Sequence, residues 1–163
     1  MRIAVERQFV VDCEYNNPTH QLISMAIAPL WPTDGYFFHP QESPDKEFYE
    51  VIGPFPSEID PWVVENVIPH LKKEPISYSL FQKKLGEFLL KHRVQELHYD
   101  WCDDIAYFNR ALITGPGERL SMPCEFLSHT HHPDIEVASK VAHNALHDAR
   151  AIAAAIRQRL VLK

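Results

Sequence analysis

The stretch from Phe9 to Tyr15 constrains the chain most, because it is a short apolar run that ends in two carboxylates one residue apart. Alternate side chains of a β-strand share a face, so Asp12 and Glu14 are predicted to point the same way from the end of a buried strand. Two like charges repel each other there unless a cation lies between them, and a divalent metal ion is the usual one. A bare D-x-E also fits two carboxylates that face water, so other residues have to decide between these interpretations.

Length and composition predict one globular domain, residues 1–163. An apolar share of 45% and an aromatic share of 11% are ordinary for a folded protein and exclude a disordered one. The net charge of −6 argues against broad, nonspecific binding to duplex nucleic acid. It does not exclude a nucleic-acid enzyme, because a carboxylate metal site is itself negative and bound divalent ions would offset its charge.

The cysteines Cys13, Cys102 and Cys124 are odd in number and have no C-x-x-C spacing. Neither a disulfide framework nor a ribbon-type zinc site is therefore indicated. No apolar run approaches the length of a membrane span, and the first residues lack the basic-then-apolar pattern of a signal peptide. We expect a soluble, cytoplasmic protein that does not associate with membranes.

The first part of the chain alternates apolar runs with turn signals. Strands are predicted at about Gln8–Cys13, at Gln21–Ala28, which is apolar on both faces, and at Tyr36–Phe38 after the turn Pro32–Gly35. These segments would form an opening meander of three strands. The segment Pro40–Pro56 is rich in proline and acidic residues and is predicted to be a long surface connection.

Two helices are predicted next. Asp60 and Pro61 fit the N-cap and the first position of a helix that ends or kinks near Pro69. A second helix is predicted to open at Ser79, because Gln82 follows at a capping-box spacing.

The remaining chain alternates strands and helices. We predict strands at Val94–Tyr99 and Cys124–Leu127, a helix at Ile105–Leu112 that Gly115–Gly117 ends, and a last helix at Asn144–Leu160. Three opening strands followed by this alternation indicate an α/β fold with a mixed central sheet of about five strands, flanked by helices.

The start of the last helix carries His143 and Asp148, five positions apart. Within one regular helix this spacing separates two side chains by about 140° around the axis, so they would not converge. They converge if His143 lies in the loop before the helix and Asp148 lies in its first turns. The aspartate can then bind a metal ion while the imidazole accepts a proton from water near neutral pH.

Together these motifs resemble the DEDDh group of 3′–5′ exonucleases: D-x-E at the end of the first strand, an aspartate opening a mid-chain helix, and H-x4-D at the last helix. The group includes the proofreading subunit of bacterial DNA polymerase, RNase T and oligoribonuclease. The chain looks most like the short stand-alone bacterial exoribonucleases of this superfamily, which have a D-x-E-[FY] start. The other matching segments are Leu22–Ser24, Trp62–Pro69 and His143–Arg150.

This resemblance implies a ribonuclease H-like fold and hydrolysis of single-stranded nucleic acid from its 3′ end, with release of nucleoside 5′-monophosphates. By the family's roles, Asp12, Glu14 and Asp148 would hold the first of two Mg²⁺ or Mn²⁺ ions, and Asp12 would bridge to the second. Asp104 would support the second ion, and His143 would be the general base.

Likeness to the exoribonucleases favours RNA as the substrate. A DNA exonuclease and a catalytically silent domain that binds nucleic-acid ends are the alternatives. The same likeness is the only basis for expecting a homodimer.

The second motif departs from the family pattern. An acidic corner of Asp100, Asp103 and Asp104 stands where the family usually has an Asn-x-x-Phe-Asp-like run. We choose Asp104 as the ligand because an apolar helix start follows it, with Asp103 as the second choice and Asp100 as a residue near the ligands. Helix capping and solvation explain one of these aspartates but not all three.

Aromatic residues near the motifs are candidates for base stacking. Tyr15 follows Glu14 where the family often places a residue that touches the terminal base, so substrate binding is expected there, with core packing as an equal alternative. Trp31 and Trp101 can also stack on bases, but packing within the protein is the preferred interpretation.

The histidine-rich segment His129–His132 and nearby Cys124 lack the pairing of a zinc site. We interpret them as part of a polar loop near the substrate instead of a soft-metal site. His147, next to Asp148, is interpreted as a surface histidine or one that lies near the metal without binding it.

Overall fold

The fold is built around strand β1 (Gln8–Asn16), in which Phe9, Val10 and Val11 are fully buried. Burial of such a run on both faces requires a strand inside the sheet with a layer packed on each side. The computed structural model of the chain describes residues 5–31, 42–121, 126–131 and 137–161.

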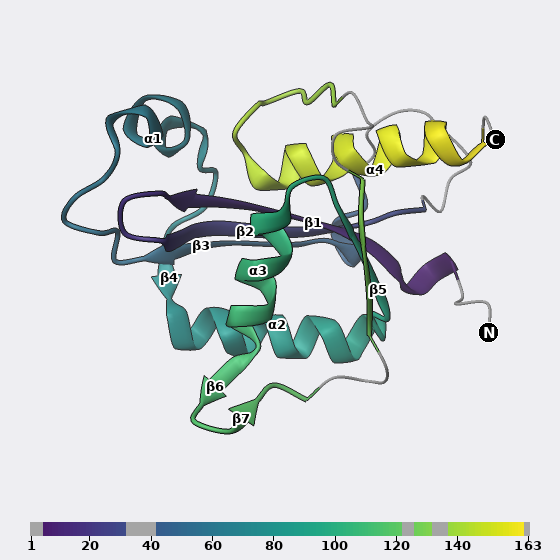
Figure 1. Cartoon of the computed structure of the whole chain (residues 1–163), viewed down its shortest axis with the longest axis horizontal. Coiled ribbons are helices and arrows are strands. Elements are labelled where there is room, and N and C mark those ends of the chain that lie inside the picture. Colours follow the sequence, from purple (N-terminus) through teal and green to yellow (C-terminus); the bar gives the residue numbers. More distant parts are fainter. Residues whose placement is uncertain (1–4, 32–41, 122–125, 132–136, 162–163) are drawn as a thin grey trace.

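The main sheet has six strands: β1 with β2 (Gln21–Pro29), β3 (Phe48–Gly53), β4 (Ile76–Ser77), β5 (Glu96–Tyr99) and β8 (Leu127–Thr130). Their order is β4-β3-β2-β1-β5-β8. Figure 1 shows the sheet between the helices α4 and α2. The pairs β1–β2 and β2–β3 are antiparallel, whereas β1–β5, β5–β8 and β3–β4 are parallel. A separate hairpin joins β6 (Ile113–Gly115) to β7 (Glu118–Arg119). Because β1 and β5 are parallel, both end at the same edge of the sheet.

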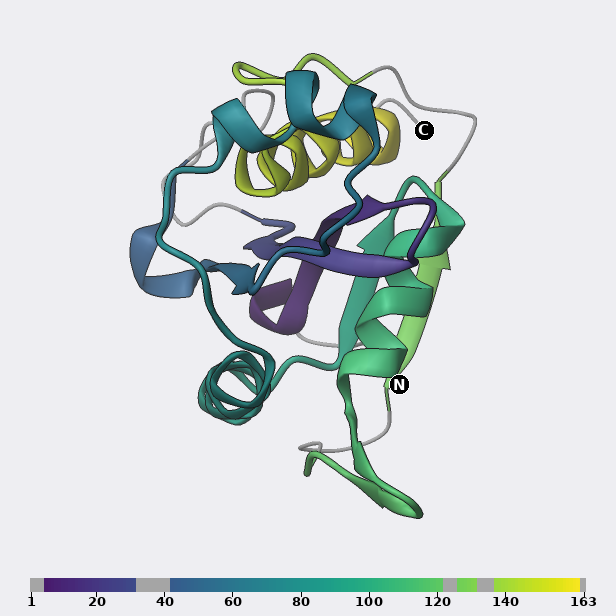
Figure 2. The same cartoon turned by 90° about the vertical axis from the view of Figure 1, so that its left-hand side faces the viewer.

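Helices cover both faces of the sheet. The long helix α4 (Ala145–Val161) and the short α1 (Pro61–Asn66) lie on one side, and α2 (Tyr78–His92) and α3 (Cys102–Ala111) lie on the other (Figure 2). Three short 3-10 turns complete the described elements: η1 (Val5–Arg7), η2 (Pro44–Lys46) and η3 (Ile68–His70). Within the described residues, none of the helices combines the length and the apolar character needed to cross a membrane.

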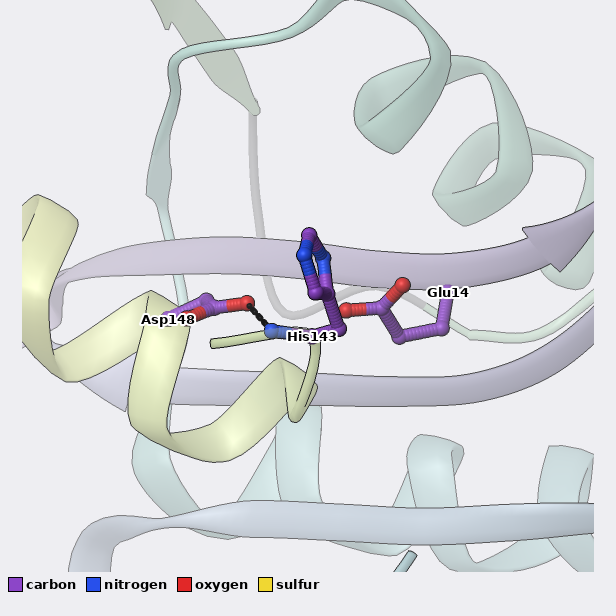
Figure 3. A group of neighbouring side chains, drawn as sticks. All are labelled: Glu14, His143 and Asp148. Atoms are coloured by element: carbon purple, nitrogen blue, oxygen red, sulfur yellow. Dashed lines mark hydrogen bonds between the residues drawn. The ribbon is translucent and has the colours of Figure 1, made fainter. Parts of the chain in front are cut away.

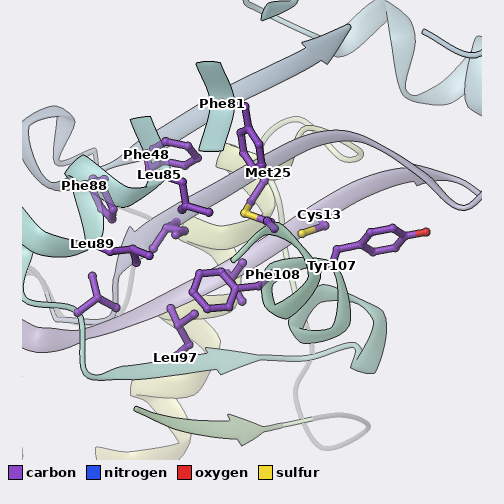
Figure 4. Close-up of a cluster of buried hydrophobic side chains, with 14 of the residues drawn as sticks. Cys13, Met25, Phe48, Phe81, Leu85, Phe88, Leu89, Leu97, Tyr107 and Phe108 are labelled. Carbon is purple, nitrogen blue, oxygen red and sulfur yellow. The ribbon is translucent and has the colours of Figure 1, made fainter. Parts of the chain in front are cut away.

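The two faces of the sheet have cores of different character. The core toward α2 and α3 contains large side chains, among them Phe81 and Phe108 (Figure 4). The core toward α4 consists largely of small residues, including Ala26 of β2 and Ala149 and Ala153 of α4. Close packing of small side chains brings α4 near the sheet, which fixes the position of the residues at the start of this helix.

Much of the predicted architecture is confirmed. The structure is an α/β fold with a mixed sheet, although the main sheet has six strands instead of about five. The predicted capping by Asp60 is present, because its Oδ1 accepts a hydrogen bond of 2.8 Å from the backbone N–H of Trp62. The last helix begins at Ala145, one residue after the predicted start.

The prediction of a surface connection at Pro40–Pro56 is wrong, because this segment contains β3. Phe48 and Val51 of β3 are buried against the neighbouring strand and helix. Prolines and acidic residues on both sides obscured this short apolar alternation. The predicted strand Tyr36–Phe38 and its turn, Pro32–Gly35, lie outside the described residues.

Other boundaries also differ from the prediction. Helix α2 is capped by Ser77 Oγ, which accepts a backbone hydrogen bond of 3.3 Å, and not by Ser79, because the strand β4 leads directly into the helix. Helix α3 begins three residues before Ile105, since its aspartates occupy the first turn, where the helix dipole favours negative charge. Gly115–Gly117 turns the β6–β7 hairpin instead of ending α3. Strand β8 runs beyond the predicted Cys124–Leu127, whose first two residues are outside the described part.

Asn16 links the end of β1 to the segment before α1. Its side chain is fully buried, and its Nδ2 donates hydrogen bonds to Glu58 O at 2.9 Å and to Thr19 Oγ1 at 2.7 Å. Its Oδ1 accepts a hydrogen bond of 2.9 Å from the backbone N–H of Asp60. We expect Asn16→Ala to lower the free energy of unfolding by about 2–3 kcal/mol, because it leaves these backbone groups unpaired.

Urea unfolding monitored by circular dichroism would measure this loss. Asn109→Ala, on the exposed side of α3, is the matched control and should change the stability by less than about 0.5 kcal/mol. Equal losses in both variants would contradict a structural role for the Asn16 hydrogen bonds.

Candidate metal centre

A cavity of about 440 Å³ lies at the edge of the sheet where β1 and β5 end. Helices α3 and α4 begin beside it, and α1 forms part of its wall. Carboxylates from four parts of the chain line it: Asp12, Glu14, Asp100, Asp104 and Asp148. The sequence motifs therefore meet in one cavity, together with His143 and the aromatic side chains of Tyr15, Trp62 and Trp101.

One group of ligand atoms comes from Asp12, Asp100 and Asp104, whose carboxylate oxygens lie within 4.8 Å of one another. Asp104, only 2% exposed, is held by a hydrogen bond of 3.1 Å from the backbone N–H of Cys13 to its Oδ1. The Oδ2 atoms of Asp12 and Asp104 are buried and have no hydrogen-bond partner among the described residues. Buried polar atoms are almost always paired, so these two oxygens point to a missing ligand.

A second group comes from Glu14, His143 and Asp148, which also offer ligand atoms within 4.8 Å of one another (Figure 3). His143 precedes α4 in a left-handed conformation, with φ of 63°. Its backbone N–H donates a hydrogen bond of 2.9 Å to Asp148 Oδ2. His143 thus lies in the loop before the helix, the condition under which its side chain was expected to converge with that of Asp148. The imidazole ring also contacts the indole of Trp62, with ring centroids 4.8 Å apart.

The carboxylates perturb each other strongly. Burial and the charge of Asp148 raise the pKa of Glu14 to about 8, and burial and the charge of Asp100 raise the pKa of Asp104 to about 8. Burial, followed by the charge of Asp104, also raises the pKa of Asp12 well above its usual range. Burial raises the pKa of Asp148 as well. These groups resist ionising together unless positive charge enters the cavity.

The donor set fits hard divalent cations. Five carboxylates and one imidazole suit Mg²⁺ or Mn²⁺, which prefer oxygen ligands, whereas a soft metal would need thiolates or more imidazoles. The two groups of three ligands share one cavity, and the unpaired Oδ2 atoms of Asp12 and Asp104 are available as ligands. Each of the two groups is therefore a candidate site for such an ion.

The grouping of the ligands can be compared with the sequence-based expectation. Asp12 was expected to share the first ion with Glu14 and Asp148 and to bridge to a second ion supported by Asp104; its carboxylate groups with those of Asp100 and Asp104, which is compatible with the bridging role. The strand explains this, because Asp12 lies nearer to the end of β5, whereas Glu14 lies one pleat further along β1. Asp100 was interpreted as lying near the ligands, and the structure places its carboxylate among them.

The structure separates Asp104 from Asp103. Asp104 points into the cavity, whereas Asp103 is exposed and accepts hydrogen bonds from Tyr15 Oη at 2.9 Å and from Trp101 Nε1 at 3.2 Å. Tyr15 lines the cavity and stacks on Tyr107, with ring centroids 4.7 Å apart. Both alternatives considered for Tyr15, packing and a position beside the substrate, are therefore compatible with its surroundings.

Sequence reasoning missed the tryptophans of the cavity wall. Trp101 was expected to pack within the protein, but it is 48% exposed, and Trp62 is 51% exposed. Both side chains line the cavity. Their positions beside the D-x-E and H-x4-D residues depend on how α1 and the segment between β5 and α3 pack, which local sequence patterns do not predict. Trp31, in contrast, packs near Ala28 and donates a hydrogen bond of 2.6 Å to Gln8 Oε1.

The other histidines lie outside the residues that line the cavity. His129 and His131 pack against His98 of β5, and His98 Nδ1 is 2.8 Å from His131 Nε2. Cys124 and His132 are outside the described residues. His147 is partly buried on α4, and its backbone N–H donates a hydrogen bond to Asn144 Oδ1 at 3.3 Å.

The chain is thus an α/β protein with a carboxylate-lined cavity that is suited to divalent metal ions. No protein-family model, curated protein or solved structure matches it.

In the absence of metal, the protein is expected to lose stability as the pH rises from about 6.5 to 8.5. Glu14 and Asp104 have pKa values of about 8 in the folded state. Their values in an unfolded chain are about 4, so only the folded state keeps these protons at neutral pH. This stabilisation is complete below the unfolded pKa and is lost as the pH rises through about 8. Urea unfolding in EDTA should show a decrease on the order of 1–2 kcal/mol.

Two comparisons assign this effect to the cavity. Asp104→Asn removes one titrating group and should flatten the pH dependence, and saturating Mg²⁺ should restore stability at high pH because it binds only the folded state. His98 acts in the opposite direction, since burial lowers its pKa to about 3, but its contribution changes only below about pH 6.5. Stability independent of pH in EDTA would contradict the proposed mutual repulsion.

Proposed function

We propose that the protein is a metal-dependent 3′–5′ exonuclease of the DEDDh type, which shortens single-stranded nucleic acid, RNA in preference to DNA, and releases nucleoside 5′-monophosphates. The observation that carries this proposal is the presence of five carboxylates and one imidazole, in two neighbouring groups of three, in one cavity. A phosphodiester held between two cations is the arrangement used for in-line displacement at phosphorus. The ordered motifs D-x-E and H-x4-D, with Asp104 between them in the chain, give independent support.

The proposal includes a ribonuclease H-like fold. A mixed sheet with helices on both faces, and a carboxylate cavity where two parallel strands end, supports this assignment. Helices α3 and α4 contribute Asp104 and Asp148 from their first turns, where the helix dipole tolerates negative charge. The same dipoles favour an anionic substrate at this edge.

In this reaction, His143 accepts a proton from the attacking water as oxygen bonds to phosphorus. The bond from phosphorus to the 3′ oxygen of the penultimate nucleotide, on the 5′ side of the one released, breaks, and that oxygen takes up a proton from solvent. Asp148 fixes the backbone of His143 through the 2.9 Å hydrogen bond, so the imidazole faces the cavity. Two Mg²⁺ or Mn²⁺ ions, held by the carboxylates, would supply the positive charge that activates water and stabilises the departing oxygen.

The first test combines purified protein, Mg²⁺ or Mn²⁺, and 5′-labelled single-stranded oligonucleotides of RNA and DNA. Stepwise shortening of RNA from its 3′ end supports the proposal. Shortening of DNA alone supports a DNA exonuclease. Binding without cleavage supports a catalytically silent domain. The set of repelling carboxylates argues against this alternative, because burial of such groups without function only destabilises the fold.

The second-motif ligand is tested by a pair of neighbouring variants. Asp104→Asn should reduce kcat by more than about 1,000-fold, because it removes a charged ligand from a transition state that depends on the metal ions. Asp103→Asn should change kcat by less than about fivefold, because Asp103 is exposed and an amide oxygen can still accept the hydrogen bond from Tyr15. Rates of 3′-end shortening measure both effects. A larger loss in Asp103→Asn would assign the ligand to Asp103 instead.

The role of His143 is tested by separating catalysis from metal binding. His143→Ala should lower kcat by about 100-fold or more, the usual contribution of a general base. The Mn²⁺ affinity, measured by isothermal titration, should change by less than about threefold if the imidazole is a base, whereas loss of a metal ligand costs about tenfold or more. An unchanged rate near neutral pH would remove the general-base assignment. A large loss of Mn²⁺ affinity would make His143 a ligand.

A further inference from the structure

A second cavity, of about 480 Å³, has Tyr107 in its lining, whereas Tyr15 lines the carboxylate cavity. The rings of Tyr15 and Tyr107 stack on each other. Leu22, which pairs with Tyr15 across β1 and β2, also lines the second cavity. The two cavities are therefore neighbours that share a wall of two stacked tyrosines, and we name the second one the aromatic cavity.

The lining of the aromatic cavity combines apolar surface with one permanent positive charge. Leu22 and Ile52 form a buried apolar base, and aromatic rings of Tyr78 and Tyr107 lie around it. The guanidinium carbon of Arg110 lies 5.9 Å from the centre of the Tyr107 ring. Aromatic faces beside a guanidinium fit a flat base that carries an adjacent phosphate.

Arg110 is suited to bind this phosphate. Within the described part of the chain, Arg110 forms no ion pair with a carboxylate, so no described acidic group neutralises its charge. The described residues that line the carboxylate cavity include neither a lysine nor an arginine. Arg110 lines the aromatic cavity, so its guanidinium can meet the phosphate of a nucleotide that is bound there.

From these observations we propose that the aromatic cavity binds one nucleotide of the substrate strand on the 5′ side of the scissile bond. The base lies between Tyr78 and Tyr107, and Arg110 pairs with the phosphate of that nucleotide. This inference rests on the proposed exonuclease function, since it requires the 3′ end of the same strand to lie in the carboxylate cavity.

Kinetics with an RNA octamer test the assignment. Tyr78→Ala and Arg110→Gln should each raise KM by at least about fivefold, the smallest loss expected when one base-stacking contact is removed. Because neither residue lines the carboxylate cavity, kcat should change by less than about twofold. Arg110→Lys should recover part of the affinity. Circular dichroism and thermal unfolding would verify that the variants are folded.

Lys91→Gln is the matched control for the charge of Arg110. Lys91 is exposed in the last turn of α2, about 20 Å along the helix axis from Tyr78, and should leave KM within twofold of the parent value. An unchanged KM in both Tyr78→Ala and Arg110→Gln would overturn the proposal. An equal rise of KM in Lys91→Gln would also overturn it, because the effect would then come from net charge.

A binding experiment separates the remaining outcomes. Fluorescence anisotropy with a labelled octamer, in EDTA so that no hydrolysis occurs, should show weaker binding by the two cavity variants. If the parent protein hydrolyses neither RNA nor DNA but this difference persists, the exonuclease function fails and the nucleotide site stands. If the variants lose affinity for adenosine 5′-monophosphate alone, while octamer binding and KM are unchanged, the cavity takes a free nucleotide and its assignment to the substrate strand is wrong.

Discussion

Mutual repulsion of carboxylates at the end of β1 is the constraint on which the site depends. Asp12, Glu14, Asp104 and Asp148 are brought together by strands and helix starts that the apolar cores hold in place, and burial raises the pKa of each. The packing energy of the fold must therefore oppose the electrostatic cost of this cavity. A cation that enters the cavity relieves this repulsion. The repulsion that destabilises the metal-free fold would therefore also favour cation binding.

Two features of the fold bring the carboxylates of the cavity together. Parallel pairing of β1 with β5 places the ends of both strands at one edge, where Asp12 and Glu14 lie in the second half of β1 and Asp100 directly follows β5. Helices α3 and α4 then begin at the same edge and contribute one further aspartate each, Asp104 and Asp148. The small residues between α4 and the sheet hold this helix close, so His143 and Asp148 reach the residues of β1. Packing far from the cavity thereby sets its geometry.

The sequence predicted the parts of this arrangement that depend on local patterns. The buried run of β1, the capping by Asp60 and the spacing of His143 and Asp148 are local, and each is present in the structure. The sharing of ligands between Asp12 and Asp100, and the position of Trp101 in the cavity wall, depend on the pairing of distant strands, which local patterns do not specify. Strand β3 was missed because its flanking prolines and acidic residues resemble a loop, whereas its burial results from contact with β2.

The two cavities differ in how each would meet a polyanion. The protein has a net charge of −6, and five acidic side chains line the carboxylate cavity, so the metal-free protein does not attract phosphate to the site where the chemistry is proposed. Attraction must then come from bound cations in the carboxylate cavity and from Arg110 with its aromatic neighbours in the other. Affinity from base stacking depends little on salt, whereas affinity from phosphate contacts decreases as salt rises. The proposed nuclease would therefore hold its strand chiefly by stacking and position the scissile phosphate by metal binding, so that substrate is aligned for hydrolysis only when the cations are present.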